Sequence, residues 1–480
     1  MLQFLVIAGY LLLTLVLGVL SFRASKETPT DFFLADRKTG AFVLFFTLIA
    51  TNFSAFFFLG FAGAGYRIGY SYYGIMAFGT AFVALSFYFL GDKIRILGEK
   101  KGYITPPELI GGQTASQILK FVYLAVMVVF TIPYLAIQPI GAGLLLQEMT
   151  GGWASYFQGA VALTAIIIIY VFIGGMRSVA WTDVFKGVLM FTLMLAAVWI
   201  IGEHHGGLAE ANKKAFLAKP ELFSRSGAGV FFTHKLWFSY MLLWLLCVPM
   251  FPQMFTRFFM AGSSRPLKIS AAVYPIVTAV LFIGPIIIGV LGHLSFPDLA
   301  GKAADNILPM MLNKFVPDWL AAFLMVGALA AFMSTMDSQL LALSSMLTRD
   351  VYMKFFKQDA QLGRQVLVGR ILVVVLAIAG LAIAYQPPAT IFQIATQAFT
   401  GLAVLFPTTV AVLYWKNTSA VSCVVSIVVG EAMVVGFQTG FLSSDLSFGF
   451  LPVVPIVLTA ALIICAGSAI PPILTKRKQT

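Results

Sequence analysis

Long apolar stretches alternate with short polar loops along the whole chain. About 20 apolar residues are enough for one helical membrane span, and the apolar runs here are continuous, unlike the alternating pattern of a transmembrane barrel. Thirteen segments qualify as spans: 2–22, 40–65, 70–92, 119–148, 152–174, 180–202, 230–261, 268–295, 317–348, 365–386, 389–415, 418–438 and 449–470. The pattern predicts an all-α polytopic membrane protein with about 13 transmembrane helices and a short surface helix near 306–315.

Composition agrees with this prediction and limits the number of domains. Of the 480 residues, 60% are hydrophobic and only 10% are charged, whereas soluble domains are about half apolar and a quarter charged. The thirteen spans use up most of the chain, so we expect a single transmembrane domain over 1–480. The net charge of +12 is spread over short loops between spans, which indicates membrane orientation and no nucleic-acid partner.

The basic residues predict how the chain is oriented in an inner (plasma) membrane. With the N-terminus outside and the C-terminus in the cytoplasm, 23 of the 31 Lys and Arg residues fall on the inward side, as the positive-inside rule requires. Those 23 include Lys186, Arg257 and the basic tail at 476–478.

Two spans contain helix-breaking sequence. The second span carries Ala-Thr-Asn-Phe-Ser-Ala at 50–55, followed by three phenylalanines, and the seventh carries Pro249 and Pro252. Unwound backbone is tolerated in hydrocarbon only where it lines a cavity or is buried in protein. The breaks are five spans apart, which is typical of two inverted five-helix repeats that each open with a broken helix. We therefore expect repeats at 40–202 and 230–415, an extra helix at 2–22 and two more over 418–470.

A polar stripe interrupts the ninth span. Ser334 and Ser338 are four residues apart and share a helix face, which Asp337 borders. Hydroxyl and carboxylate oxygens suit a hard cation such as Na⁺, and the unwound carbonyls of Ala50 and Phe53 are a natural second source of ligands. The alternative interpretation is that the hydroxyls bond back to their own helix.

These segments resemble the sodium/solute symporter family, which includes bacterial proline, pantothenate and sialic acid carriers and animal monocarboxylate carriers. The resemblance covers nearly the whole chain. It rests mainly on Gly-Gly-Met-Arg-Ser-Val-Ala-Trp-Thr-Asp at 174–183, on Ala-Ala-Phe-Met-Ser-Thr-Met-Asp-Ser-Gln-Leu at 330–340 and on 50–55. It implies a LeuT-type fold of 5+5 inverted repeats.

The resemblance also implies ion sites. A sodium ion would be held by the carbonyls of Ala50, Phe53 and Ala331 and the hydroxyls of Ser334 and Thr335. A second sodium, or a proton, would bind near Asp183, Asp337 and Ser338, together with Ser334. Relatives can carry serine at the position of Asp337 and glutamine at that of Lys186, so a cation at Lys186 would pair with Asp183 and suppress the second sodium.

The solute is placed by the same resemblance between the broken spans and the third, fourth and eleventh spans. The expected contacts are Asn52, Ser54, Phe56, Phe57, Tyr73, Gln138, Phe251, Gln253 and Gln397. Phenylalanines argue against a polyol and favour a small molecule with an apolar part and one carboxylate. They have an equally simple alternative role in helix packing.

The sequence therefore predicts a sodium-coupled symporter with Na⁺ and a small organic solute as its partners. A monocarboxylate is favoured, a proline-like amino acid comes second, and a sugar is less favoured. A channel would need filter-like motifs, and a transporter-like sensor would need a signalling domain. An enzyme would need a catalytic constellation, which the four histidines do not form with any carboxylate pair. No obligatory protein partner is evident.

Overall fold

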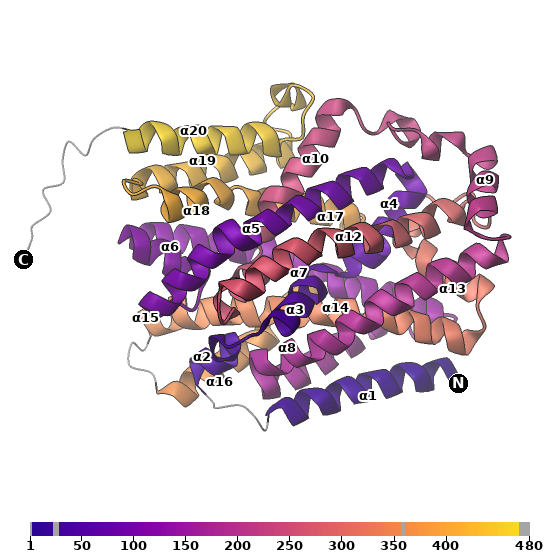
Figure 1. Cartoon of the computed structure of the whole chain (residues 1–480), viewed down its shortest axis with the longest axis horizontal. Helices are drawn as coiled ribbons and strands as arrows, with labels where there is room; N and C mark the ends of the chain where they lie inside the picture. The colour runs from indigo at the N-terminus through magenta and orange to yellow at the C-terminus, as the bar shows by residue number, and fades with distance from the viewer. Residues whose placement is uncertain (1, 23–27, 357–360, 470–480) are drawn as a thin grey trace, which may run out of the picture.

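The computed structural model describes residues 2–22, 28–356 and 361–469. Among the basic residues that the sequence predicts to face inward, Arg23, Lys26, Lys357, Lys476, Arg477 and Lys478 lie outside these ranges. The described chain is helical apart from its loops and one isolated bridge between Thr39 and Ala261. Most helices lie side by side along the long axis of the molecule (Figure 1). The predicted all-α class is confirmed.

The long apolar helices form the body of the bundle. They are α5 (Ser71–Lys101), α7 (Gln117–Met149), α8 (Tyr156–His204), α12 (Ser264–Gly292), α14 (Asp318–Met346), α16 (Leu362–Tyr385), α19 (Ala420–Thr439) and the pair α17 (Ile391–Ala403) and α18 (Leu405–Tyr414). Within the described residues, eight such elements are long and apolar enough to cross a membrane, and two bent pairs raise the number to ten.

The α8 helix consists of two helical segments joined at a kink. Its 49 residues would extend about 73 Å as one straight helix, more than twice the roughly 30 Å of a bilayer core. The helix is interrupted at Gly175, whose φ of 58° and ψ of −156° are not helical. A Cβ on this glycine would lie 2.5 Å from the Phe32 ring, so the turn needs glycine for both conformation and space. The predicted break between 152–174 and 180–202 falls here.

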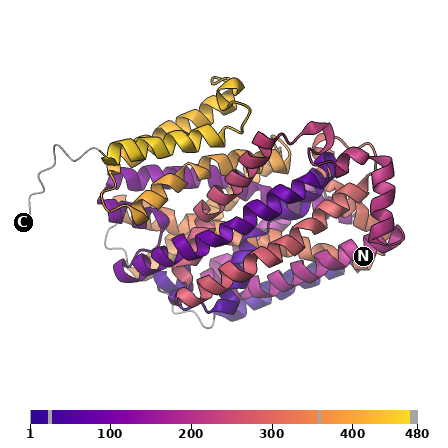
Figure 2. The same ribbon diagram turned by 45° about the horizontal axis from the view of Figure 1, so that its top comes forward.

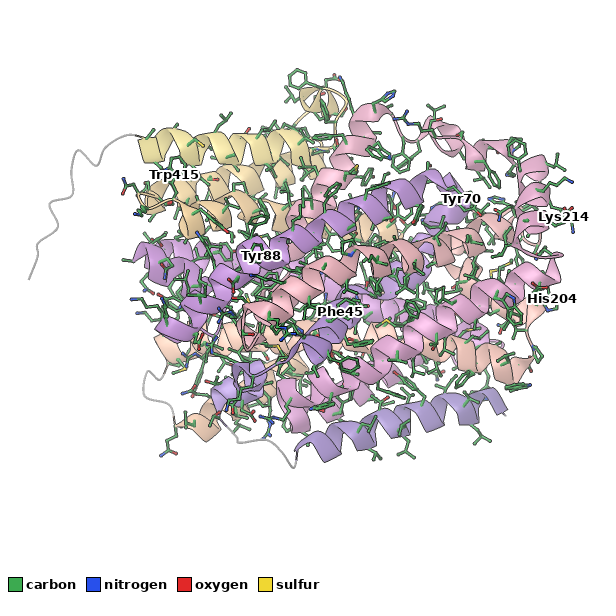
Figure 3. All side chains as sticks on the ribbon, in the orientation of Figure 1. Phe45, Tyr70, Tyr88, His204, Lys214 and Trp415 are labelled. Atoms are coloured by element: carbon green, nitrogen blue, oxygen red, sulfur yellow. The ribbon has the colours of Figure 1, made fainter. Side chains whose placement is uncertain are left out.

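Shorter helices cover the edges and ends. On one long edge α1 (Leu2–Phe22) packs against α8 and α14, while α19 and α20 (Val453–Ala469) pair on the opposite edge (Figures 1 and 2). Helix α9 (Leu208–Ala218) lies at one end of the molecule, and α2 (Pro29–Leu34), α6 (Pro106–Thr114) and α15 (Met353–Phe355) lie toward the other. We name these the α9 end and the α6 end. In Figure 3, Tyr70, His204 and Lys214 lie toward the α9 end and Trp415 toward the α6 end.

The two broken spans are present where the sequence predicts them. The first consists of α3 (Ala41–Asn52), the π-helical turn η2 (Phe56–Gly60) and α4 (Phe61–Ile68), and bends by 56°. The second consists of α10 (His234–Cys247), the 3-10 turn η5 (Val248–Met250) and α11 (Pro252–Met260), and bends by 54°. The predicted short helix near 306–315 is α13 (Ile307–Phe315), which follows the 3-10 turn η6 (Gly301–Asn306). Its predicted surface position is wrong, because its apolar side chains from Ile307 to Leu312 are largely buried against neighbouring helices. The total of 13 spans and the repeat boundaries stay predictions.

The α6-end halves of the two broken spans are joined to each other. The Thr39 N–H donates to the Met260 carbonyl (3.1 Å), and the Gly262 N–H donates to the Thr39 carbonyl (3.1 Å). Thr39 precedes α3, whereas Met260 ends α11. The two broken spans therefore run in opposite directions, which is the arrangement that inverted repeats require.

Candidate functional site

The first break diverts a backbone donor to a side chain of another helix. In an unbroken helix the Ala55 N–H would donate to the Thr51 carbonyl, but here it donates to Gln138 Oε1 on α7 (3.0 Å). Phe53 is extended, with φ −90° and ψ 105°, and the Phe57 N–H turns to the Ser54 carbonyl (2.9 Å). The carbonyls of Thr51 and Phe53 are left without their helical donors.

The hydroxyl of Thr335 lies against both of these carbonyls. Its Oγ1 donates to the Thr51 carbonyl (3.1 Å) and to the Phe53 carbonyl (3.2 Å). All three residues are buried or nearly so, and Thr335 is fully enclosed. An intact helix, α14, thus reaches the unwound backbone of the first broken span through one hydroxyl.

The oxygens of this cluster fit a small hard cation. Ligands at about 2.4 Å, a distance typical of Ca²⁺, place neighbouring oxygens about 3.4 Å apart when they subtend a right angle at the ion. The two separations measured from Thr335 Oγ1, 3.1 and 3.2 Å, are close to this value. Hydroxyl and carbonyl oxygens are the ligand types that Na⁺ prefers. The residues present therefore fit a sodium ion.

The other residues of the expected sodium site lie close by, with one difference. Ala50 on α3 and Ala331 on α14 are fully buried, and the two helices pack on each other. Ser334 faces another way, because adjacent residues on a helix point about 100° apart. Its hydroxyl donates to Asp183 Oδ1 (2.6 Å). Thr51 was not among the expected ligands, although its carbonyl contacts Thr335.

A cluster of buried charges adjoins the break on its α6-end side. Asp183 on α8 forms an ion pair with Arg257 on α11 (3.3 Å) and accepts a short hydrogen bond from Thr47 on α3. The Arg257 guanidinium also donates to Thr47 Oγ1 (3.2 Å) and to Ser338 Oγ. This pair connects α3, α8, α11 and α14 at one point.

A second ion pair lies beside the first. Lys186 Nζ is 2.8 Å from Asp337 Oδ2, and both side chains are fully buried. Tyr170 donates to the same carboxylate oxygen (2.6 Å) and lies 3.1 Å from the lysine nitrogen. Ser338 donates to the other oxygen, Asp337 Oδ1 (3.2 Å).

One expectation about these charges needs correction. The sequence paired Lys186 with Asp183, but the structure pairs Lys186 with Asp337 and Asp183 with Arg257. Residues three apart on a helix lie on the same face, so the choice of partner depends on which side chains α11 and α14 bring to that face. Lys186 and Arg257, which the sequence counted on the inward side of the membrane, are completely buried, and their side stays a prediction.

The second break is built from prolines and apolar side chains. Pro249 and Pro252 have no N–H to donate, and the Val248 carbonyl accepts instead from the Phe251 N–H (3.2 Å). Phe251 is extended, with φ −60° and ψ 127°. Gln253 follows the break, and both of its side-chain polar atoms are buried without a hydrogen-bond partner among the described residues.

A narrow cavity of about 20 Å³ lies between the two breaks. Its wall holds no charged side chain and is mostly aromatic. The lining residues are Asn52, Phe56, Phe57, Phe61, Met76, Thr80, Tyr134, Trp244, Val248, Phe251, Phe282 and Phe399. The Phe399 ring contacts the rings of Tyr134, Phe251 and Trp244 at centroid distances of 4.7, 4.7 and 5.2 Å. The cavity has room for about one water molecule, so the rings must move apart before a solute can enter.

The expected solute contacts divide into two groups. Asn52, Phe56, Phe57 and Phe251 line the cavity. The structure does not bring the other expected contacts to the cavity wall. Ser54 accepts from the Phe56 N–H, Tyr73 donates to the Ala279 carbonyl on α12, and Gln138 accepts from the Ala55 N–H. Gln253 is buried away from the cavity, and Gln397 is exposed on α17.

Several cavity residues were missed because they come from helices far apart in sequence. Trp244 lies one turn before the second break, and its indole Nε1 is buried without a partner among the described residues. Tyr134 lies one turn before Gln138, a spacing that could have identified it once Gln138 was singled out. No local sequence pattern singles out Phe399 on α17.

A polar contact joins α4, η6 and α17. Arg67 in α4 pairs with Asp305 in η6 (2.9 Å), and the other Asp305 oxygen accepts from the Ile391 N–H at the start of α17 (3.0 Å). Burial raises the pKa of the Asp305 carboxyl above its ordinary value, and the Arg67 guanidinium opposes that shift. A single carboxylate therefore joins all three elements.

Comparison with known proteins identifies the family of the chain. A model of the sodium:solute symporter family matches residues 32–430. The sodium/pantothenate symporter of Escherichia coli is 27% identical over 96% of this chain and 95% of its own length. The osmoregulated proline transporter OpuE of Bacillus subtilis is 26% identical, over 95% of this chain and 92% of its own.

Solved structures support the same fold. A substrate-bound, outward-open structure of a Na⁺-coupled sialic acid symporter superposes with a TM-score of 0.83 at 19% identity, covering 98% of this chain and 97% of the other. Mhp1, a nucleobase-cation-symport-1 family transporter, gives a TM-score of 0.61 at 14% identity, covering 91% of this chain and 93% of its own. The fold is the LeuT type predicted from the sequence. The family model spans more than half of the chain, and the protein belongs to the sodium:solute symporter family.

Proposed function

We propose that this protein is a sodium-coupled symporter that moves a small organic solute by alternating access. The observation that carries the proposal is the contact of Thr335 Oγ1 with the carbonyls of Thr51 and Phe53. We propose a sodium site made of the Ala50, Phe53 and Ala331 carbonyls with the Ser334 and Thr335 hydroxyls, to which the geometry adds the Thr51 carbonyl. Use of Ser334 requires its hydroxyl to turn from Asp183 to the ion.

Sodium at this point would couple an intact helix to a broken one. An ion held by both α3 and α14 stabilises the arrangement in which the two are in contact, so it shifts the population between the two access states. One Na⁺ crossing 100 mV releases about 2.3 kcal/mol, and a tenfold gradient adds about 1.4 kcal/mol. The sum, about 3.7 kcal/mol, supports on the order of 500-fold accumulation of a neutral solute.

The cavity favours a solute with an apolar body and zero net charge. Aromatic walls give apolar contact, and the ring faces attract cationic groups. The Trp244 Nε1–H, which lacks a partner among the described residues, can donate to a carboxylate. An anion without a counter-charge would be costly in a wall with no charged side chain. The geometry therefore favours a zwitterionic amino acid of the proline type over the monocarboxylate that the sequence favoured.

The names of the relatives are a reason to test both a proline-like amino acid and an organic acid as the solute. Their names include sodium/pantothenate symporter and sodium/proline symporter, at identities too low to transfer a solute. The test is uptake of radiolabelled L-proline, pantothenate, lactate and glucose into proteoliposomes with and without an inward sodium gradient. We expect sodium-driven accumulation of L-proline that saturates with concentration. Uptake that is the same with potassium in place of sodium would reject the proposal, and unsaturable flux would indicate a channel.

We propose a multi-pass location in the inner membrane with the α9 end outside. This places the N-terminus outside and the C-terminus in the cytoplasm, as the basic residues predict. Single cysteines at Lys214 near the α9 end and at Lys100 at the α6-end terminus of α5, in a chain with its native cysteines replaced, test it. An impermeant thiol reagent added to intact cells should label the first and leave the second unlabelled.

A further inference from the structure

The buried charges beside the first break are balanced within the protein. Two carboxylates, Asp183 and Asp337, face two cations, Arg257 and Lys186, and all four side chains have zero exposure. Lys120 and Asp350 form another pair nearer the α6 end, and they do not contact this group. The sum of charges in the group is zero before any transported ion enters it.

Every carboxylate oxygen already accepts at least one hydrogen bond. Asp183 Oδ1 accepts from Ser334, and its Oδ2 accepts from Thr47 and Arg257. Asp337 Oδ2 accepts from Lys186 and Tyr170, and its Oδ1 accepts from Ser338. Among the described residues, the polar atom of this cluster that lacks a partner is Arg257 Nη1, which is a donor. A positively charged nitrogen repels an incoming cation and cannot be its ligand.

An added sodium ion would therefore be unfavourable in this cluster. It would give a net charge of +1 in a site without solvent, where an uncompensated charge is strongly destabilising. It would also lie next to the Lys186 and Arg257 cations, which repel it. The residues that the sequence proposed for a second sodium are present, but the protein's own cations already neutralise their carboxylates.

We propose that Lys186 and Arg257 are fixed counter-cations that take the place of a second transported sodium, so that each transport cycle carries one sodium ion. This inference rests on the proposed function. Lys186 is the residue that sets the number, because its single ammonium neutralises Asp337. Arg257 has further contacts with Thr47 and Ser338, so its replacement would disturb the first broken span as well.

A neutral residue at position 186 should allow a second sodium ion to bind. Lys186→Gln leaves the group with a net charge of −1 and frees one lone pair of Asp337 Oδ2, while Tyr170 and Ser338 still orient the carboxylate. Sodium can then enter as the missing cation. The double variant Lys186→Gln/Asp337→Asn restores neutrality and removes the carboxylate, so it should lose the added ion again.

The test counts sodium ions bound to purified full-length protein, using ²²Na⁺ alone in a scintillation-proximity assay. We expect one ion per chain for the wild type, two for Lys186→Gln and one for the double variant. Lys93→Gln, which removes a cation stacked on Tyr414 away from this cluster, should leave the count at one. Adding Thr335→Val to Lys186→Gln should reduce its count to one by removing the first site.

The possible results distinguish a failure of the one-sodium proposal from a failure of the proposed sodium coupling. Two ions bound to the wild type, or one ion bound to a folded Lys186→Gln, overturns the inference while sodium coupling stands. No specific sodium binding to the wild type overturns the proposed function itself. If Lys186→Gln cannot be purified, the wild-type count and the double variant still decide, since the inference requires one ion for both.

Discussion

The two broken spans bend by nearly the same angle, 56° and 54°, but they do so by different chemistry. At the first break every donor is kept, and the Ala55 N–H is redirected to Gln138. At the second break the donors are absent, because Pro249 and Pro252 have no N–H. The first break leaves two carbonyls that an outside hydroxyl can reach, whereas the second leaves an apolar turn.

This difference indicates a division of roles. Oxygen atoms are concentrated at the first break, which makes it the place for a cation. The second break contributes Val248 and Phe251 to the cavity wall and, one turn earlier, Trp244. We expect sodium to depend on the first break alone and the solute to depend on both.

The largest effect is expected at the contact between α14 and the first break. Thr335→Val keeps the shape of the side chain but removes the hydroxyl that contacts Thr51 and Phe53, so the ion loses a ligand. We expect the apparent affinity for sodium to fall at least tenfold, about 1.4 kcal/mol, as measured by uptake against sodium concentration. Thr131→Val is the matched control, because the buried Thr131 hydroxyl has no partner among the described residues. Equal sodium curves for the two variants would contradict the site.

The next test compares one glutamine at each break. Gln138→Leu removes the acceptor of the buried Ala55 N–H, which should cost about 1–3 kcal/mol and lower the melting temperature of the purified protein. Gln253→Leu removes an amide that has no partner and should leave the melting temperature unchanged or higher. If uptake alone falls in Gln253→Leu, that side chain contacts the solute in another state. Equal losses of stability would remove the distinction between the two breaks.

A smaller effect is expected from one ring at each break. Phe56→Leu and Phe251→Leu each remove an aromatic wall of the cavity, so the solute KM should rise about two- to tenfold, corresponding to roughly 0.5–1.4 kcal/mol. The sodium dependence should stay as in the wild type for both variants. Phe238→Leu, at an exposed ring on α10, controls for general effects. A change in sodium affinity with Phe251→Leu would show that the roles are not divided.

The smallest effect concerns the far end of the first broken span. The ring of His293, just beyond α12, stacks on Tyr66 of α4, and its Nε2 lies 2.7 Å from the Tyr66 carbonyl. Burial lowers the pKa of His293 below its ordinary value of 6.5. The folded protein therefore takes up this proton at lower pH than the unfolded chain, and the stability it contributes is complete above pH 6.5 and is lost as the pH falls below it.

Melting curves measure this dependence. Between pH 7 and pH 5 the wild type should lose stability, and His293→Gln should show a shallower dependence because the titrating ring is gone. His234→Gln, at an exposed histidine of α10, should keep the wild-type slope. An unchanged slope in His293→Gln would show that this contact does not titrate in the range.

The sequence predicted what depends on local pattern. Apolar runs predicted the long apolar helices, and proline or polar residues within two of these runs predicted both breaks. Each of these signals lies within a few neighbouring positions. The stripe of hydroxyls on α14 predicted the partner of the first break. Thr335 entered only through the family resemblance, because the shared face of Ser334 and Ser338 does not include it.

What the sequence could not predict depends on how helices are rotated against each other. The diversion of the Ala55 N–H to Gln138 releases the Thr51 carbonyl, a contact of Thr335 that the sequence did not single out. Lys186 and Asp183 differ by three positions yet face different partners. The rings of Tyr134, Trp244 and Phe399 meet in space from three helices, and Gln397 on α17 faces outward although Phe399 faces the cavity.

The backbone link between Thr39 and the end of α11 has a mechanical consequence. Two hydrogen bonds, each worth about 1 kcal/mol net, join the α6-end arms of the two broken spans. We expect a displacement of one arm to be transmitted to the other through this link. An ion that binds only the first break can in this way set the position of the second, where it has no ligand of its own.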